Sequence, residues 1–425
     1  MLLSRLHKLK PILSSTKQLL FRSHFPSGRH LSELVKLTEH GIRDNDRDLL
    51  HVETRNMCRC ETCFGKHNHQ KTGQPFRTGN LHPGVKVTDI GNVSEHYVSL
   101  TWSDGHTGLV ARTIRGEYGP EPVPTILDKY LDLSMRYNRC QEFWSAKTDE
   151  NSKVFDYNTV ISSVGNTRDF LAHYMIHGVG FLTEIPANKE MLDIIADLKC
   201  GPIRETIFGG VDVVRVKPNP ANAGYGSGSL AGHTDLNYYY QNPHVEFFHA
   251  MENTVEGGDS FWVDTFSAIS EVREERPDYF DILCRVPIYH RFTPPGTDHY
   301  VRSHHTLVTM LGEDIFQISD NPWSTDTPLA TYTLDLETRR QWWEAYLYYR
   351  AKVEDQSRWI MRKLEGGEVV VLDNFRVCHG RKEFGRTEQG QERMVGTAYV
   401  NWNHLQRVLL SPVEAEPCFL ETEKH

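Results

Sequence analysis

Three widely separated side chains place the strongest constraint on how this chain can fold. His233 and Asp235 stand in the run His-Thr-Asp, and His379 follows far downstream. Two imidazoles and one carboxylate on one face of a metal leave the opposite coordination positions open, an arrangement that suits ferrous iron with a co-substrate and dioxygen. A fold that brings the three together would therefore build a site of the iron-oxygenase type.

The His-x-Asp pattern has ordinary alternatives. The chain contains 22 histidines, so about one such pattern is expected by chance in a chain of this size. The run His244-Val245-Glu246 is a rival pattern on a candidate strand face. His233 alone could also be a hydrogen-bonded histidine of the surface or the core.

The neighbouring segments favour the metal interpretation. Asp235 precedes the β-prone run 236–240, which predicts that His-x-Asp stands at a strand entrance with both side chains on one face. Residues 367–373 are mostly apolar. They predict a buried strand that delivers His379 just beyond its end.

Arg393 is the candidate anchor for a dicarboxylate co-substrate. It precedes the strand-like run 398–400, and its forked, permanently charged group pairs well with carboxylates. Three other arginines near His379 are rivals: Arg376, Arg381 and Arg386.

The motifs together resemble a known family. His233-Thr234-Asp235, then Gly257-Gly258-Asp259-Ser260, then the run 373–381 and Arg393 occur in this order. This is similar to the taurine-dioxygenase superfamily of Fe(II)/2-oxoglutarate oxygenases, and within it to the γ-butyrobetaine and trimethyllysine dioxygenases. The resemblance extends from about residue 50 to about residue 410.

The resemblance implies a function and roles for several residues. His233, Asp235 and His379 would bind Fe(II), while Arg393 and Ser260 would bind 2-oxoglutarate. It implies a homodimer that acts on a small molecule, with ascorbate as a candidate reductant. The implied reaction hydroxylates an unactivated C–H bond of a cationic carboxylic acid, with γ-butyrobetaine preferred and trimethyllysine as the alternative. A zinc-stabilised scaffold without catalytic activity is the competing hypothesis of another class.

The resemblance also implies a substrate pocket. Aromatic faces hold quaternary ammonium groups, which cannot donate hydrogen bonds. Four residues align with positions that surround such a group, and Asn321 aligns with a contact to the substrate carboxylate; the four are Phe208, Asn222, Tyr225 and Tyr399. Core packing is the ordinary alternative for each aromatic ring.

Asp212 is a departure from the family pattern, because the family places a tryptophan there. Loss of that ring removes about 0.5–2 kcal/mol of cation–π attraction. A carboxylate could replace it by Coulomb attraction, and it would then accept a hydrogen-bearing ammonium as well. The substrate could therefore be γ-butyrobetaine or another cationic acid.

The eight cysteines do not form a disulfide framework, because only Cys58, Cys60 and Cys63 cluster. Three close thiolates and one histidine would complete a structural zinc site. Local spacing favours His67 or His69 as the fourth ligand and His82 is a further candidate, whereas the resemblance favours His106, which we choose. Unligated, reduced cysteines are the alternative.

Composition sets limits on partners and location. Residues 1–32 contain no acid but several basic residues and a leucine stripe, which predicts a mitochondrial transit peptide; an ordinary basic helical tail is the alternative. We therefore expect the mitochondrial matrix, with the cytoplasm as the alternative location. A net charge of −9 argues against nucleic acid as the main partner, and no apolar run is long enough to span a bilayer.

The fold class we expect is mainly β with flanking helices. The predicted domains are the transit peptide at 1–32, a small zinc-binding β domain at 45–130, and a jelly-roll oxygenase domain at 150–412. The resemblance implies that this jelly roll is a double-stranded β-helix. A strand is expected at 179–183. Helices are expected at 169–177, 188–198, 267–286 and 336–353.

Overall fold

The computed structural model divides the chain into two compact units, with the boundary at residue 134. The structure describes residues 35–45, 47–63, 81–94, 97–112, 141–217, 222–293, 300–326, 334–385 and 392–410. The predicted transit peptide at 1–32 lies outside the described residues. Of the described helices, none is both long and apolar enough to cross a membrane.

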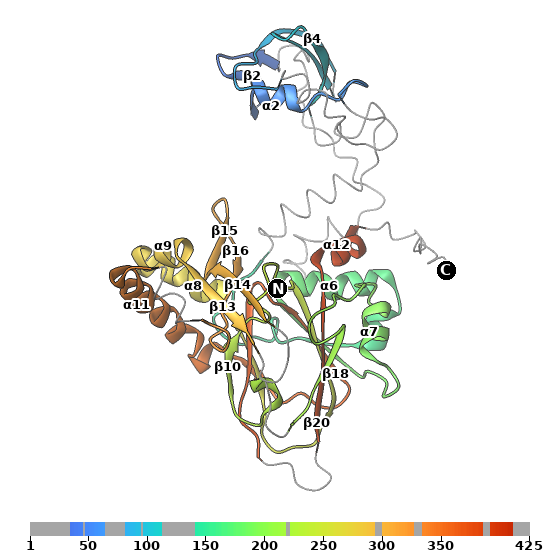
Figure 1. Ribbon diagram of the computed structural model, residues 1–425. Helices are drawn as coiled ribbons and strands as arrows, with labels where there is room; N and C mark the ends of the chain where they lie inside the picture. Colours follow the sequence, from blue (N-terminus) through green and yellow to red (C-terminus); the bar gives the residue numbers. More distant parts are fainter. Residues whose placement is uncertain are drawn as a thin grey trace. The chain divides into compact units, whose positions relative to one another are not determined.

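The N-terminal unit contains two three-stranded antiparallel sheets and one short helix (Figure 1). The elements are β1 Val35–Leu37, β2 Gly41–Asp44, β3 Arg47–Leu50, α2 His51–Asn56, β4 Val87–Val93, β5 Tyr97–Trp102 and β6 Thr107–Ala111. Alternate residues of β5 are buried, namely Val98, Leu100 and Trp102, as the two-residue period of a strand requires. A buried ion pair, 2.7 Å between Arg112 and Asp44, also lies within this unit.

Eight strands of the larger unit form a jelly roll (Figure 1). They are β9 Val211–Val214, β10 Leu230–His233, β11 Val245–Asn253, β12 Ser260–Asp264, β17 Ile360–Arg362, β18 Glu368–Asp373, β19 Val377–Arg381 and β20 Arg393–Val400. One sheet has the order β18-β11-β20-β9 and the other β10-β19-β12-β17. Apart from the central pair β12 and β17, consecutive strands alternate between the two sheets, which is the double-stranded β-helix that the sequence predicts.

The two sheets enclose an apolar core. All six residues of β18 are buried, which agrees with the prediction of a buried strand at 367–373. Phe181 of one sheet meets Trp262 of the other edge to face, with ring centroids 5.0 Å apart. The first sheet is extended by β8 Val179–Thr183 and β7 Val154–Asp156.

Helices accompany the extended sheet. They are α5 Tyr157–Ile161, α6 Val164–His177, α7 Met191–Asp197 and α12 Trp402–Leu410. The α6 helix begins at the cap Ser163, whose side chain accepts from the amide of Asn166. It ends at Gly178, whose φ of 75° is easily adopted by glycine. The strand β8 follows at once, as predicted.

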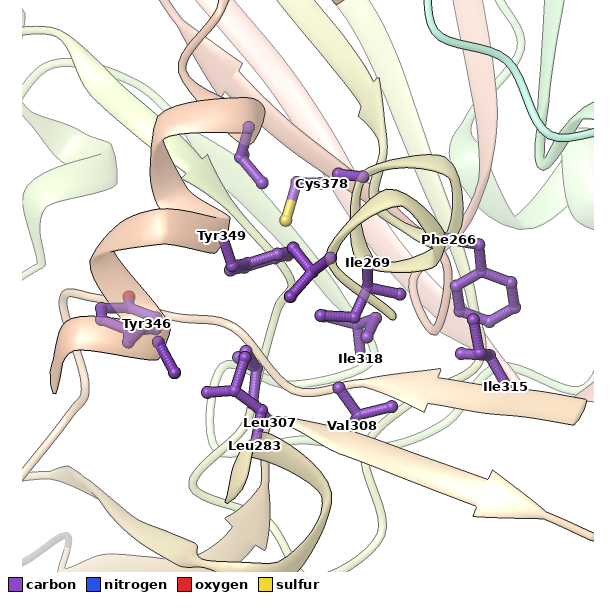
Figure 2. Packing of buried hydrophobic residues seen from close by; sticks show 14 of the residues in the cluster. Phe266, Ile269, Leu283, Leu307, Val308, Ile315, Ile318, Tyr346, Tyr349 and Cys378 are labelled. Atoms are coloured by element: carbon purple, nitrogen blue, oxygen red, sulfur yellow. The ribbon is translucent and has the colours of Figure 1, made fainter. Parts of the chain in front are cut away.

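An insertion of helices and hairpins separates β12 from β17. Its elements are α8 Thr265–Glu275, α9 Pro277–Arg285, β13 Pro287–Phe292, β14 Val301–Thr306, β15 Val308–Leu311, β16 Asp314–Ile318, α11 Leu336–Val353 and the short η4 Gln356–Arg358. Figure 2 shows side chains of α8, α11 and the β15–β16 hairpin converging on one buried cluster around Ile269, Ile318 and Tyr349. This packing fixes the insertion beside β19, since Cys378 belongs to the same cluster.

The prediction of one helix over 267–286 is wrong in one respect, because two helices occupy this stretch. Pro277 is the first residue of α9 and Arg276 precedes it with non-helical dihedral angles. Proline lacks an amide hydrogen and disfavours helical geometry in the residue before it, so the chain turns there.

Candidate active site

The three predicted metal ligands meet at one mouth of the jelly roll. His233 ends β10 and pairs directly with His379 of β19. Nε2 of His233 lies 3.3 Å from Oδ1 of Asp235, and Nε2 of His379 lies 3.8 Å from the same oxygen. The ligand atoms of the three residues all lie within 4.8 Å of one another, so a single cation could contact all of them.

The local backbone differs from the prediction at Asp235. The run 236–240 is a turn and not a strand, and Leu236 has a φ of 60°. Distant segments impose this turn: the amide of Thr234 donates to the carbonyl of Asp320 (2.7 Å), and the amide of Asp235 donates to Oδ1 of Asn374 (2.6 Å). The β-prone composition is overridden by these tertiary contacts.

His379 is also placed differently. It lies inside β19, after a turn that follows β18, and not just beyond the end of β18. The cross-strand pairing of β19 with β10 therefore brings the third ligand opposite the first.

Hydrogen bonds prepare the ligand atoms for a cation. Nδ1 of His233 lies 2.9 Å from the carbonyl oxygen of Ala231. It therefore carries the proton, and Nε2 keeps a free lone pair directed at the centre. The phenol of Tyr399 donates to Oδ2 of Asp235, which leaves Oδ1 facing the two imidazoles.

The protonation states also suit a metal. Burial and the nearby His233 together lower the pKa of His379 to about 3, against the opposing charge of Asp235, so the imidazole is neutral at pH 7. Burial opposes ionisation of Asp235, but the adjacent imidazoles of His233 and His379 favour it, and the pKa of the carboxyl lies well below its usual range. The site therefore offers a neutral imidazole at His379 and an ionised carboxylate at Asp235, beside the imidazole of His233.

The rival pattern His244-Val245-Glu246 contributes only a neighbour of the site. The ring of His244 stacks on Phe375 with centroids 4.1 Å apart, and His244 does not belong to either group of candidate metal ligands among the described residues. Glu246 is fully buried with Oε2 3.7 Å from Nδ1 of His379. Burial and the nearby Asp235 raise its pKa well above the usual value.

Every residue predicted for the iron, the co-substrate and the substrate lines one cavity of about 450 Å³. These residues are His233, Asp235, His379, Ser260, Arg393, Phe208, Asp212, Asn222, Tyr225, Asn321 and Tyr399. They come from β9, β10, β12, β19 and β20 and from the loops between the elements. Non-local strand pairing is what gathers them.

The co-substrate anchor predicted at Arg393 begins β20 and is 8% exposed. Burial lowers its pKa to about 10. Nε has no hydrogen-bond partner among the described residues. A buried guanidinium without such a partner favours an anionic ligand. The side chain of Ser260, on β12, faces the same cavity.

The rival arginines have structural partners or fall outside the description. Arg376 is fully buried against Asp264, 2.7 Å away. Arg381 lines the cavity but donates to the carbonyls of Gly226 (2.8 Å) and Gly228 (2.6 Å). Arg386 lies outside the described residues.

The predicted substrate residues also contact one another or the surrounding fold. Asp212 and Tyr225 form a polar pair, since the phenol donates to the carboxylate at 2.6 Å. Asn222 instead caps the short helix η3 Ala223–Tyr225 by accepting from the amide of Gly224. Phe208 packs edge to face on Phe292, with ring centroids 5.5 Å apart.

Asn321 also serves the local fold. Its Nδ2 donates to the carbonyl of Thr234 (3.0 Å), and its Oδ1 accepts from the amides of Trp323 and Ser324. These bonds use the carbonyl oxygen and one of the two amide hydrogens.

Several cavity residues were not predicted: Tyr238, Arg291, Phe292 and Trp323. Phe292 stacks on Tyr238 with centroids 5.0 Å apart. Arg291 and Phe292 end β13, which belongs to the insertion. Their sequence carries no motif, and their approach to the cavity depends on how the insertion packs.

The N-terminal unit holds a second candidate metal centre. Nε2 of His106 lies 3.3, 3.4 and 3.5 Å from the sulfurs of Cys58, Cys60 and Cys63. Burial raises the pKa of Cys58, so three thiolates here would need a cation to stabilise them. His82 instead accepts from the amide of Gly84, and His67 and His69 lie outside the described residues.

The jelly roll and the convergent His-Asp-His set define the class as 2-oxoglutarate-dependent dioxygenases, whose non-haem iron is held by such a triad. The chain belongs to the family described as taurine catabolism dioxygenase TauD, TfdA, whose model matches residues 142–398. Dependence on Fe(II) and 2-oxoglutarate is typical of this family. A second model, gamma-butyrobetaine hydroxylase-like, N-terminal, matches residues 43–110.

Two named relatives and one solved structure illustrate the similarity. Trimethyllysine dioxygenase, mitochondrial, of Rattus norvegicus is 24% identical over 394 residues, which cover 86% of each chain. Gamma-butyrobetaine dioxygenase of Homo sapiens is 28% identical over 217 residues, which cover 49% of this chain and 54% of the relative. An asparagine oxygenase solved with Fe(II), 2S,3S-3-hydroxyasparagine and succinate matches with a TM-score of 0.46 at 13% identity, covering 64% of this chain and 90% of that one.

Proposed function

We propose that His233, Asp235 and His379 bind Fe(II) and that Arg393 and Ser260 bind 2-oxoglutarate through its distal carboxylate. The observation that carries this proposal is the convergence of the three ligand atoms in the cavity that also holds Arg393. Two imidazoles and one carboxylate match the donors that ferrous iron takes in such sites. Nε of Arg393 has no partner in the described part of the chain, which supports an anion at the far end.

When bound, the iron and 2-oxoglutarate supply the oxidation, in which one dioxygen converts 2-oxoglutarate to succinate and CO2 and hydroxylates a C–H bond. The protein contributes position and exclusion of water. Val395, Thr397 and Tyr399 follow Arg393 on the inward face of β20. At about 3.3 Å per residue this strand spans the cavity from the co-substrate anchor to the iron ligands.

For the substrate, we propose a carboxylic acid that carries a cationic nitrogen. The aromatic rings of Phe208, Tyr225 and Tyr399 in the cavity support a quaternary ammonium such as that of γ-butyrobetaine. Asp212 favours the second candidate, trimethyllysine, because that amino acid also carries a hydrogen-bearing ammonium. The similarity to trimethyllysine dioxygenases over most of both chains supports the same candidate.

A structural zinc ion in the N-terminal unit is a further part of the proposal. Cys58, Cys60, Cys63 and His106 supply the three sulfurs and one nitrogen of a closed tetrahedral site. Such an ion would stabilise a unit whose two small sheets enclose a modest core.

We also propose a mitochondrial location and a homodimeric state. The acid-free segment at 1–32 and the relatives named as mitochondrial support the first. The homodimer rests on the family resemblance, and gel filtration with light scattering tests it.

The decisive experiment measures succinate release with Fe(II), 2-oxoglutarate and either γ-butyrobetaine or trimethyllysine. His379→Ala should abolish substrate-coupled succinate formation, whereas the control His304→Ala, an exposed histidine of β14, should retain it. Normal coupled turnover by His379→Ala would refute the ligand assignment. A wild-type protein that binds 2-oxoglutarate but turns over no substrate would favour the scaffold alternative.

A further inference from the structure

Two of the charged side chains that line the cavity have no role assigned so far. Asp235 and the two histidines belong to the proposed iron site, Arg393 to the co-substrate, and Arg381 to the loop carbonyls that it holds. Asp212 and Arg291 remain, and they carry opposite charges. A cavity with one further anionic and one further cationic side chain fits a ligand that carries both charges.

The position of Arg291 is fixed by its backbone. Its amide donates to the carbonyl of Ser324 (2.7 Å), and the neighbouring His290 lies 3.0 Å from the hydroxyl of Ser324 through Nδ1. These bonds join the end of β13 to the loop 321–326, which lines the same cavity. Phe292, the next residue, stacks on Tyr238 of the cavity wall.

The guanidinium of Arg291 keeps its capacity to bind an anion. Nε lies 3.6 Å from Oδ2 of Asp326, longer than a normal hydrogen bond, and the side chain is 45% exposed. Within the described parts of the chain, the terminal nitrogens of Arg291 form no hydrogen bond that would occupy them. Asp326 thus orients the group, while its forked end has no partner among the described residues and could take a carboxylate.

Asn321 is a weaker candidate for the same role. Its carbonyl oxygen and one amide hydrogen hold the loop and Thr234. One remaining neutral donor binds a carboxylate less strongly than a guanidinium with two parallel donors does.

We propose that Arg291 binds the anionic group of the substrate and, together with Asp212, selects zwitterionic acids. This inference rests on the proposed hydroxylase function and deepens it. Asp212 is held by Tyr225 on the β9 side, while Arg291 approaches from the insertion. The insertion therefore supplies the cationic group of the substrate site, while the jelly roll supplies Asp212 together with the metal and co-substrate sites.

The test uses pairs of compounds that differ in one charge: γ-butyrobetaine and trimethyllysine, each as the free acid and as the carboxyl methyl ester. Binding is measured anaerobically by calorimetry with Fe(II) and 2-oxoglutarate present, and turnover by succinate release. The variants are Arg291→Gln, Arg291→Lys and the control Arg302→Gln. Arg302 is the cross-strand partner of Arg291 on β14 and does not line the cavity.

For the compound that binds, we expect the wild type to bind the free acid more tightly than its methyl ester. Arg291→Gln should lose this preference. The Kd and KM for the acid should rise about 10- to 100-fold, as for a lost charge-assisted hydrogen bond, while the values for the ester and for 2-oxoglutarate stay unchanged. Arg291→Lys should recover part of the preference, and Arg302→Gln should keep all of it.

Several outcomes overturn the inference. They are equal binding of acid and ester by the wild type, a preference that survives Arg291→Gln, an equal loss in Arg302→Gln, or no binding of either form. Failure of the proposed function looks different, because 2-oxoglutarate would then not be converted to succinate with any compound. Equal turnover of the acid and the ester would contradict only the proposed role of Arg291 and would leave the proposed function intact.

Discussion

The phenol of Tyr399 donates a hydrogen bond to Oδ2 of Asp235, with 2.5 Å between the two oxygens. The bond joins the end of β20 to the turn after β10 and leaves Oδ1 of Asp235 3.3 Å from Nε2 of His233. Tyr399 therefore orients the carboxylate in addition to lining the substrate cavity.

Tyr399→Phe should weaken iron binding and coupled turnover. Without the phenol, the carboxylate of Asp235 can rotate, or its Oδ2 can bind the metal. Loss of such a supporting contact typically costs 10- to 100-fold in metal affinity or activity, so we expect a decrease of about that size. Fe(II) titration under anaerobic conditions and succinate release measure the two effects.

The matched control for this variant is Tyr157→Phe. Tyr157 also donates to a carboxylate, that of Asp197, but it lies outside the cavity. It should leave iron affinity unchanged. Equal losses in the two variants would mean that Tyr399 acts through stability and not through Asp235.

Arg393→Gln should weaken the apparent affinity for 2-oxoglutarate, raising its KM about 10- to 100-fold, because a buried guanidinium that pairs with a carboxylate contributes charge-assisted hydrogen bonds. Arg393→Lys keeps the charge without the fork, so its KM should be intermediate. Initial rates at varied co-substrate concentration give both values. An unchanged KM in Arg393→Gln would assign the anchor to another residue.

The sequence predicted the candidate site better than its local structure. Strand β8 and helix α11 coincide with the predicted segments, since hydrophobic periodicity is a local signal. The turn at Leu236 was missed because Asp320 and Asn374, both far away in the sequence, impose it. Arg291 could not be predicted, because only the packing of the insertion brings it to the cavity.

Gly108 should be essential for the zinc site that we propose. A Cβ atom on this residue would lie 2.2 Å from Sγ of Cys58 and 3.0 Å from Nε2 of His106. Gly108→Ala should therefore lower the zinc content measured by mass spectrometry and destabilise the N-terminal unit, since a displaced ligand opens the tetrahedral site.

Gly91→Ala is the control within the same sheet. Its added methyl would meet Ser99 at 3.3 Å and no metal-ligand candidate. We expect full zinc content there. Full zinc content in Gly108→Ala as well would contradict a metal held by Cys58 and His106.

Asp212 should determine whether the protein prefers an ammonium that carries hydrogens or one that is fully methylated. Asp212→Asn removes the charge and keeps the carbonyl oxygen that can accept from Tyr225. The ratio of kcat/KM for a primary ammonium to that for its trimethylated analogue should fall about tenfold, the effect of one charged hydrogen bond.

Asp212→Trp should shift the same ratio further, since an indole ring adds about 0.5–2 kcal/mol of cation–π attraction for the methylated cation. The methylation series from primary to quaternary amine, scored by succinate release, measures both variants. A neutral or anionic compound that is turned over best would show that this cavity does not select cations.

Two histidines of α6 should make the larger unit sensitive to acid. Burial lowers the pKa of His173 to about 3, helped by His177 and Lys153, and burial with the charge of Arg376 lowers the pKa of His177 to about 4. In the unfolded chain both histidines have a pKa of about 6.5 and bind a proton below that pH, whereas in the folded chain they stay neutral until a lower pH. Stability is therefore fully present above about pH 6.5 and is lost progressively as the pH falls toward 4.

Urea unfolding at pH 7.5 and pH 5 measures this loss, which should be on the order of 1 kcal/mol for each histidine. The double variant His173→Gln/His177→Gln removes both titrating groups, so its free energy of unfolding should change less between the two pH values than that of the wild type. His304→Gln, an exposed position, should behave as the wild type does. If the double variant loses as much stability on acidification as the wild type, the acid sensitivity arises from other groups.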